Sequence, residues 1–446
     1  MIKLYRQYPE TVMLDSTYKT NRYNRPLINI VCMTGASKTV PLGYCLLDKE
    51  DQESFTWLLK ELKKLLLNHH KPSGTTAPAI ADPLPMPGVF VTNRDRGLIN
   101  ALDAVFLTTP ALICRWHVFK NVQAQARKKW PQVPVIDEET GKQTHFEDLP
   151  QTSAFMKLFR RTIDSKTLAK FNDNNAAFWA QEQSAEVGQL YNYINREYWP
   201  HKEKLVYHWI SKFPYYGQRA SSRAEGAHSA MKKWLASRRH NVLTLFLKLQ
   251  PWWALRYAAI RHSHRREKVY VPRNLKDPCY RHVVKVIHRR ALYKVAKQIA
   301  NAVEERRAIA EGKITSPTVC TGAFTTSEGM PCQHKINDII MNDGRVEFRP
   351  EQFDRHHHIK KSAAPLARIV TVDQTVYEPA VIPNNRPSNS RPRGAGRGRG
   401  RANAREPSSF EFTDLNHPAS TAPAARGGGR GRGRRGRGGL ATPSQS

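Results

Sequence analysis

Acidic residues in three short segments have the types and positions that a divalent-metal site requires. Asp15 follows the apolar run Thr11–Leu14, Asp95 lies just beyond Val89–Val91, and Glu225 stands where a helical pattern begins. Two metal ions about 3.5–4 Å apart need carboxylates from several elements, because hard cations prefer oxygen ligands and no single helix can surround them. A site of this kind supports phosphoryl transfer.

The position where a second strand-end carboxylate is expected holds an amide, Asn93. An amide offers a neutral carbonyl oxygen, so a site built on Asn93 has one anionic ligand fewer than a two-metal clamp needs. Asp95 lies two residues further on, and on an extended strand it points to the same face, displaced by about 6–7 Å. Alternatively, Asp95 is an ordinary residue at a helix N-terminus, where the dipole favours negative charge. The sequence leaves both roles of Asp95 open.

Strand and helix signals along the chain place these acidic residues on one sheet. Short apolar runs predict five strands: Thr11–Leu14, Leu27–Met33, Val40–Leu47, Val89–Val91 and Ala111–Cys114. Helical spacing of apolar residues predicts two helices between them: Glu53–Leu67 and Gly97–Val105. A third expected helix, Ala224–Leu235, carries Glu225 in its first turn. The order β-β-β-α-β-α-β favours an α/β fold, a mixed sheet with helices on its faces.

Several ordered motifs also carry a family resemblance. The segments Leu14–Thr20, Val89–Ala101, Cys114–His117 and Ser221–Leu235 resemble the transposase core of Mutator-like DNA transposons, particularly the fungal members. The resemblance runs from about residue 9 to residue 250, with a fainter echo near residues 320–334. It implies a ribonuclease-H-like mixed sheet with a helical insertion, and three acidic residues that bind two Mg²⁺ or Mn²⁺ ions.

Carried over residue by residue, the family pattern matches only part of this chain. Asp15 matches the first acidic residue and Glu225 the third, whereas the second falls on Asn93. The implied activity is that of a cut-and-paste DNA transposase, in which hydroxide and then a 3′-OH attack phosphodiester bonds. The resemblance further implies a nuclear homo-oligomer acting on transposon ends. We expect a truncated copy, because the family's N-terminal DNA-recognition module is not recognisable before the first strand.

Two other functions remain open at this point: a non-catalytic DNA-binding protein derived from such a transposase, and an RNA-binding protein acting through its C-terminal tail. Candidate DNA contacts lie in the matched motifs around Cys114–His117 and Glu225: Arg115, His117, Arg223, His228 and Lys232. The Cys114-x-x-His117 spacing also suits one half of a zinc site, but a second pair is missing nearby.

A second candidate metal site lies near the C-terminal end of the ordered part. Cys320, Cys332 and His334 resemble the end of a SWIM-type zinc finger, in which the first cysteine would fall on Thr318. Three ligands are one short of a closed structural zinc site. Candidates for the fourth ligand are the following: Cys279, His356, His357 and His358.

The charge of the chain favours a polyanionic partner. The formal net charge is +33 over 446 residues. From residue 379 onward there are 13 Arg and 3 acidic residues, so this Arg-Gly tail contributes +10 and the remainder carries +23. Lys and Arg neutralise phosphates and release counterions, which predicts nucleic-acid binding by both parts. No run of about 18 apolar residues is present, so we expect no membrane partner.

Composition divides the chain into six expected regions. The core occupies 9–120 and 213–250, and a helical, aromatic insertion occupies 121–212. A basic helical region (251–315) and the Cys/His segment (316–360) follow, and the Arg-Gly tail (379–446) should be disordered. The six dispersed cysteines form no disulfide framework, which fits a reducing compartment.

Overall fold

The described chain contains a five-stranded mixed sheet. The computed structural model describes residues 2–67, 83–182, 185–220 and 222–359. The strands are β1 (Thr11–Thr17), β2 (Leu27–Met33), β3 (Thr39–Leu46), β4 (Val89–Thr92) and β5 (Ala111–Ile113). Their spatial order is β3-β2-β1-β4-β5, antiparallel from β3 to β1 and parallel from β1 to β5. The predicted mixed sheet and its order of elements are confirmed.

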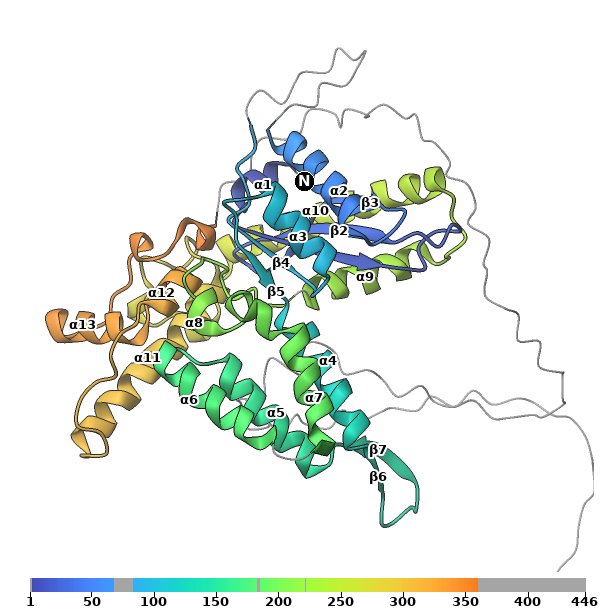
Figure 1. The fold of residues 1–446 in the computed structure, drawn as a ribbon. Helices are drawn as coiled ribbons and strands as arrows, with labels where there is room; N and C mark the ends of the chain where they lie inside the picture. The colour runs from blue at the N-terminus through green and yellow to red at the C-terminus, as the bar shows by residue number, and fades with distance from the viewer. Residues whose placement is uncertain (1, 68–82, 183–184, 221, 360–446) are drawn as a thin grey trace, which may run out of the picture. The chain divides into compact units, whose positions relative to one another are not determined.

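One face of the sheet packs against α1 (Ile2–Gln7), α2 (Gln52–Leu66) and α3 (Arg96–Val105), and Ile260 from a later helix joins the same core. Figure 1 shows α2 and α3 side by side. Their apolar side chains join those of alternate strand residues, such as Val12 and Leu14, in one buried core. Alternation along β1 therefore directs Val12 and Leu14 to this face and the residues between them to the other.

The opposite face packs against α9 (Ser222–Leu235), and α10 (Val242–Val269) lies next to α9 and β3. Met13 on β1 shares a buried cluster with Ala224 on α9. Further along the same helix, Met231 and Leu235 pack with Leu27 of β2. These contacts fix α9 over the face toward which odd-numbered residues of β1 point, which decides the surroundings of Asp15.

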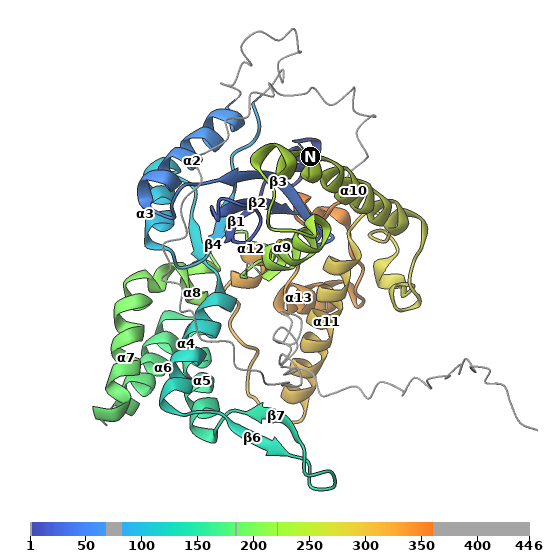
Figure 2. The ribbon, with the colours of Figure 1, turned by 90° about the vertical axis from the view of Figure 1, so that its right-hand side faces the viewer.

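A helical segment separates β5 from α9 in the sequence. It contains these elements: α4 (Arg115–Lys129), β6 (Val133–Ile136), β7 (Gln143–Glu147), α5 (Pro150–Ile163), α6 (Leu168–Trp179), α7 (Ala185–Glu197) and α8 (Tyr207–Ile210). Figure 2 shows the β6–β7 hairpin beyond the ends of the helices. The helices share a buried aromatic core that includes Phe155, Phe159 and Phe178. The sequence did not predict the hairpin, because its strands are short and mostly exposed.

The described chain ends with a third group of helices: α11 (Arg289–Ala310), α12 (Ala323–Glu328) and α13 (Gln333–Asp343). They surround a separate apolar core that includes Leu292, Val295 and Ile336. The Arg-Gly tail lies outside the described residues. Within the described part of the chain, no helix combines the length and apolar character needed to cross a lipid bilayer.

Candidate metal centres

Because side chains alternate between the two faces along β1, Asp15 points toward helix α9. Asp15 belongs to the same face of β1 as Met13, which packs against the start of α9. The side chain is 5% exposed, and its Oδ2 lies 3.6 Å from Nδ1 of His228. The Asp15 carboxylate thus lies beneath α9, next to the apolar contact between Met13 and that helix, and is largely shielded from solvent.

Helix α9 presents three polar side chains toward this carboxylate. Glu225, His228 and Lys232 are spaced at i, i+3 and i+7, which places them along one face of the helix. Ala224 and Met231 occupy the buried face against the sheet. The amphipathic pattern of α9 therefore turns Glu225, His228 and Lys232 toward the part of β1 that carries Asp15.

Helix α4 supplies a fourth side chain, because it begins immediately after β5. His117 lies in its first turn, and its Nε2 is 3.0 Å from Oε1 of Glu225. The end of a central strand, the first turn of α4 and the first turn of α9 thereby meet at one place.

These side chains line one groove of ≈ 720 Å³. Its walls contain the predicted residues Asp15, His117, Glu225, His228 and Lys232. Sequence reasoning missed the remaining polar residues of the lining: Ser16, Thr17, Ser229 and Lys233. The groove combines two carboxylates, two imidazoles and two ammonium groups, a donor set suited to a divalent cation with a nearby phosphate.

Burial controls the charges in the groove. Loss of solvent raises the pKa of Asp15 to about 7, although the positive charge of His117 opposes this shift. Burial works against protonation of His117, but hydrogen bonds with Cys114 and Glu225 outweigh it and raise its pKa to about 10. Burial lowers the pKa of His228 to about 4. His228 is therefore neutral at pH 7, and its contact with Asp15 is not an ion pair despite the short distance.

Asn93 and Asp95 are engaged in the turn between β4 and α3. Asn93 Oδ1 accepts a hydrogen bond from the backbone N–H of Asp95 at 3.2 Å. Asp95 Oδ1 accepts one from the N–H of Leu98 at 2.9 Å, which makes Asp95 the N-cap of α3. Neither residue lines the groove. The helix-start role that the sequence left open for Asp95 is observed, and its role as a metal ligand stays a prediction.

The remaining candidate DNA contacts differ in their surroundings. Arg115 Nη2 lies 2.5 Å from Oδ2 of Asp164, and its guanidinium stacks over Phe119. Arg115 is therefore part of the packing between the core and the insertion. The side chain of Arg223 lies outside the described residues.

One further polar residue next to Asp15 was missed. Asn29 of β2 is the register partner of Asp15, is completely buried, and neither its Oδ1 nor its Nδ2 has a hydrogen-bond partner within the described residues. Buried amides normally have partners. A signal was present, because Asn29 interrupts the apolar run Leu27–Met33 at a position of the same parity as residues that face α9.

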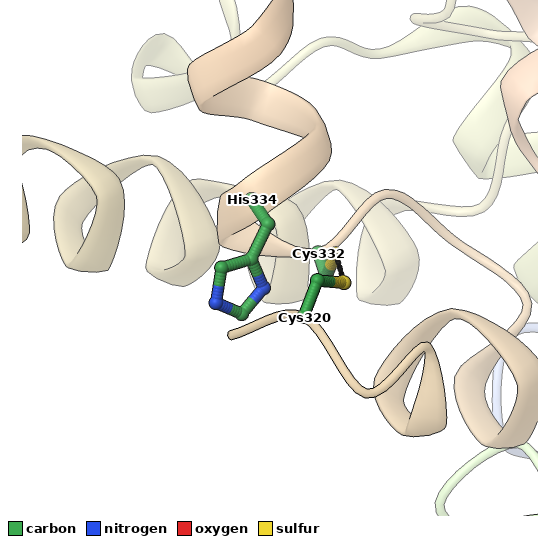
Figure 3. Close-up of side chains that lie close together, drawn as sticks. All are labelled: Cys320, Cys332 and His334. Carbon is green, nitrogen blue, oxygen red and sulfur yellow. Dashed lines mark hydrogen bonds between the residues drawn. The ribbon is translucent and has the colours of Figure 1, made fainter. Parts of the chain in front are cut away.

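The predicted Cys/His group is assembled in the structure. One candidate ligand atom from each of Cys320, Cys332 and His334 lies within 4.8 Å of the others (Figure 3). The two sulfur atoms are 3.8 Å apart. Burial opposes ionisation of Cys332, but the backbone N–H of Lys335 and a hydrogen bond with Thr325 stabilise the thiolate and lower its pKa to about 7. A ready thiolate at the start of α13 suits a metal ligand.

The expected sources of a fourth zinc ligand do not join this group within the described residues. His356 Nδ1 contacts Glu10 at 2.9 Å, and His357 Nε2 contacts the carbonyl oxygen of Glu328 at 2.5 Å. His358 Nε2 lies 3.1 Å from the carbonyl oxygen of Phe353. Cys279 also lies outside the group. These residues belong to other parts of the packing, so the expectation that one of them completes the site is not supported.

Comparison with known proteins adds three findings. Residues 11–121 match the model of the MULE transposase domain. A PKS-NRPS hybrid synthetase, cheA, from Chaetomium globosum is 25% identical over 413 residues, covering 86% of this chain. Protein FAR1-RELATED SEQUENCE 5 from Arabidopsis thaliana is 23% identical over 119 residues, or 27% of this chain. The chain spans 8% of the first relative's length and 13% of the second's.

Proposed function

Because this chain belongs to the MULE transposase family through its residues 11–121, we propose that its groove is the phosphoryl-transfer site of a DNA transposase. The observation that carries the proposal is that Asp15 and Glu225, far apart in the sequence, line one groove at the end of a central strand. The strand order β3-β2-β1-β4-β5, with a helical insertion before α9, supports a ribonuclease-H-like fold.

The residues of the groove fit a divalent cation. Burial of the Asp15 carboxylate outweighs the positive charge of His117, and its neighbour His228 is neutral, so Asp15 gains from a cation that offsets its burial. Glu225, in the first turn of α9, provides a second carboxylate in the same groove. Mg²⁺ or Mn²⁺ would supply Lewis-acid stabilisation of the phosphodiester undergoing attack. His117 contacts the Glu225 carboxylate and holds it at the groove.

The basic groups at the groove suit a DNA backbone. Lys232 and Lys233 line it, and the chain without its Arg-Gly tail carries +23. Phosphate neutralisation by such groups gives sequence-independent affinity. The proposal therefore includes DNA as the substrate, transposon ends as the sites of action, pairing of those ends by a homo-oligomer, and a nuclear location.

A second candidate function is a non-catalytic DNA-binding protein, and one specific observation favours it. Asn93 stands where the family has an acidic residue; it accepts a hydrogen bond from the N–H of Asp95 in the turn before α3, and Asp95 caps that helix. A groove with only two carboxylates binds metal more weakly and has no full two-metal clamp. RNA binding through the Arg-Gly tail remains an additional proposal that rests on composition alone.

Nicking of supercoiled plasmid DNA separates these functions. Wild type, Asn93→Asp, Asp15→Ala and Glu225→Ala would be compared with Mg²⁺ and with Mn²⁺, and Glu61→Ala on α2, outside the groove, serves as the control. We expect Asn93→Asp to nick faster than wild type, because it restores an anionic ligand at the position where the family has an acidic residue. Both alanine variants in the groove should lose nicking but keep DNA binding. Nicking that survives both alanine changes contradicts the assignment of the groove.

A further inference from the structure

The imidazole of His334 has two nitrogen atoms in different surroundings. Figure 3 shows its ring beside the sulfur atoms of Cys320 and Cys332. Nδ1 is buried and has no hydrogen-bond partner within the described residues, whereas Nε2 lies 3.3 Å from Oγ1 of Thr318. Nδ1 is therefore the nitrogen left to bind a metal. Two thiolates on a tetrahedral zinc ion lie about 3.8 Å apart for Zn–S bonds of about 2.3 Å, which equals the 3.8 Å observed here.

A relay of hydrogen bonds extends from the other side of the same imidazole. Thr318 donates to Oε1 of Glu305 from its hydroxyl, and also from its backbone N–H at 2.9 Å. Glu305 is 8% exposed, and its Oε2 accepts a hydrogen bond from Asn337 at 3.1 Å. With Nε2–H of His334 donating to Oγ1 of Thr318, every donor in this hydrogen-bond relay has an acceptor. A carboxylate in this position fixes the tautomer of a metal-bound histidine and strengthens it as a ligand.

The fourth tetrahedral position has no protein donor. No other His, Cys, Asp or Glu among the described residues joins the group formed by Cys320, Cys332 and His334. Thr318, which stands where the family motif has a cysteine, is committed to the relay. Cys320 is exposed, so solvent reaches this side of the group. Three protein ligands and one exchangeable position are the arrangement of an open zinc site rather than a closed structural one.

We propose that Thr318 and Glu305 hold His334 as a zinc ligand through Nδ1, and that the zinc keeps an open fourth position for a small thiol or imidazole donor from solution. The inference rests on the zinc site formed by Cys320, Cys332 and His334. Thr318, at the position where the SWIM-type motif has a cysteine, thus positions the ligand His334 instead of binding the metal itself.

The open position is tested with the full chain loaded with Co²⁺, whose visible spectrum reports its ligands. Adding imidazole or 2-mercaptoethanol should shift the spectrum of wild type. Thr318→Cys adds a third thiolate, so its spectrum should show stronger sulfur-to-cobalt absorption and no response to added donors. A wild-type spectrum that ignores both donors overturns the open position. If wild type binds neither Co²⁺ nor Zn²⁺, the zinc site itself is wrong, which is a separate failure.

The relay is tested by zinc affinity in competition with a chelator. Glu305→Gln and Thr318→Val should each weaken zinc binding about 10–100-fold, the usual effect of removing an outer hydrogen-bond partner. Thr318→Ser keeps the hydroxyl and should bind zinc like wild type. Glu304→Gln on the exposed side of α11 is the matched control. Unchanged affinity in both Glu305→Gln and Thr318→Val contradicts the relay.

Discussion

At the scale of single residues, the groove is defined by what surrounds Asp15. This carboxylate is buried under α9, opposite Asn29 in the strand register and beside a neutral His228. The positive charge of His117 only partly offsets the effect of this burial on the carboxylate. When the charged form of a group is disfavoured in the folded protein, its ionisation lowers the free energy of unfolding. This decrease can be measured as a function of pH.

Asp15→Asn should stabilise the metal-free protein at neutral and alkaline pH. Burial raises the pKa of Asp15 from 3.8 to about 7, so between these values the folded protein holds more protons than the unfolded chain. Wild type therefore loses stability as pH rises from about 4 to 7, and the loss is complete above that range, where it reaches up to about 4 kcal/mol. The amide side chain of the variant does not ionise and escapes this loss.

The measurement is urea unfolding of both proteins at pH 4 and pH 8 in the presence of EDTA. The free energies of unfolding should converge at pH 4 and separate at pH 8, with the variant more stable. Adding Mn²⁺ at pH 8 should stabilise wild type only. A variant that is less stable than wild type at pH 8 without metal contradicts the burial argument.

At the scale of elements, the sequence predicted the parts that depend on local pattern. The strand Leu27–Met33 was predicted with its observed bounds, and the other strands and helices of the sheet within a few residues. The β6–β7 hairpin and α1 were missed, because both are short and carry little apolar periodicity. The predicted strand Thr11–Leu14 was too short, because the observed strand continues to Thr17. Asp15 is therefore a buried strand residue and not a turn residue.

The cap of α3 gives a test that separates two roles of Asp95. Asp95→Ala should lower the free energy of unfolding by about 1 kcal/mol, because it removes the side-chain acceptor for the N–H of Leu98. Asp95→Ser keeps an N-cap but removes the carboxylate, so it should restore most of that stability. Urea unfolding measures both. If Asp95→Ser is stable but loses any metal-dependent nicking that wild type shows, Asp95 is a metal ligand as well as a cap.

At the scale of the whole molecule, the family resemblance identified residues of the groove that composition alone could not have located. Asp15, His117, Glu225, His228 and Lys232 come from three separate segments, and all of them line the groove. The resemblance grouped them, and the packing of α4 and α9 against the sheet shows how they meet. The relay through Glu305 was not predictable, because no spacing rule connects a residue in the middle of α11 with Thr318.

Deleting residues 379–446 should weaken DNA binding mainly at low salt. On duplex DNA the logarithm of affinity falls with the logarithm of salt at a slope of about −0.9 per neutralised phosphate. The tail holds 13 Arg, and we expect only some of them to contact phosphates at once, so the slope should become shallower by about 3–6 units. Fluorescence anisotropy over a salt series measures both chains. Equal slopes would show that the tail does not contact phosphates.

The central claim is that Asp15 and Glu225 form one divalent-metal site, and Mn²⁺ titration tests it most directly. Isothermal titration calorimetry at pH 8 would compare wild type with Asp15→Asn, Glu225→Gln, Asn93→Asp and the control Glu61→Gln. We predict that wild type and the control bind Mn²⁺ equally, that Asn93→Asp binds it more tightly, and that each of the two groove variants loses binding. Unchanged Mn²⁺ affinity in both Asp15→Asn and Glu225→Gln would contradict this claim.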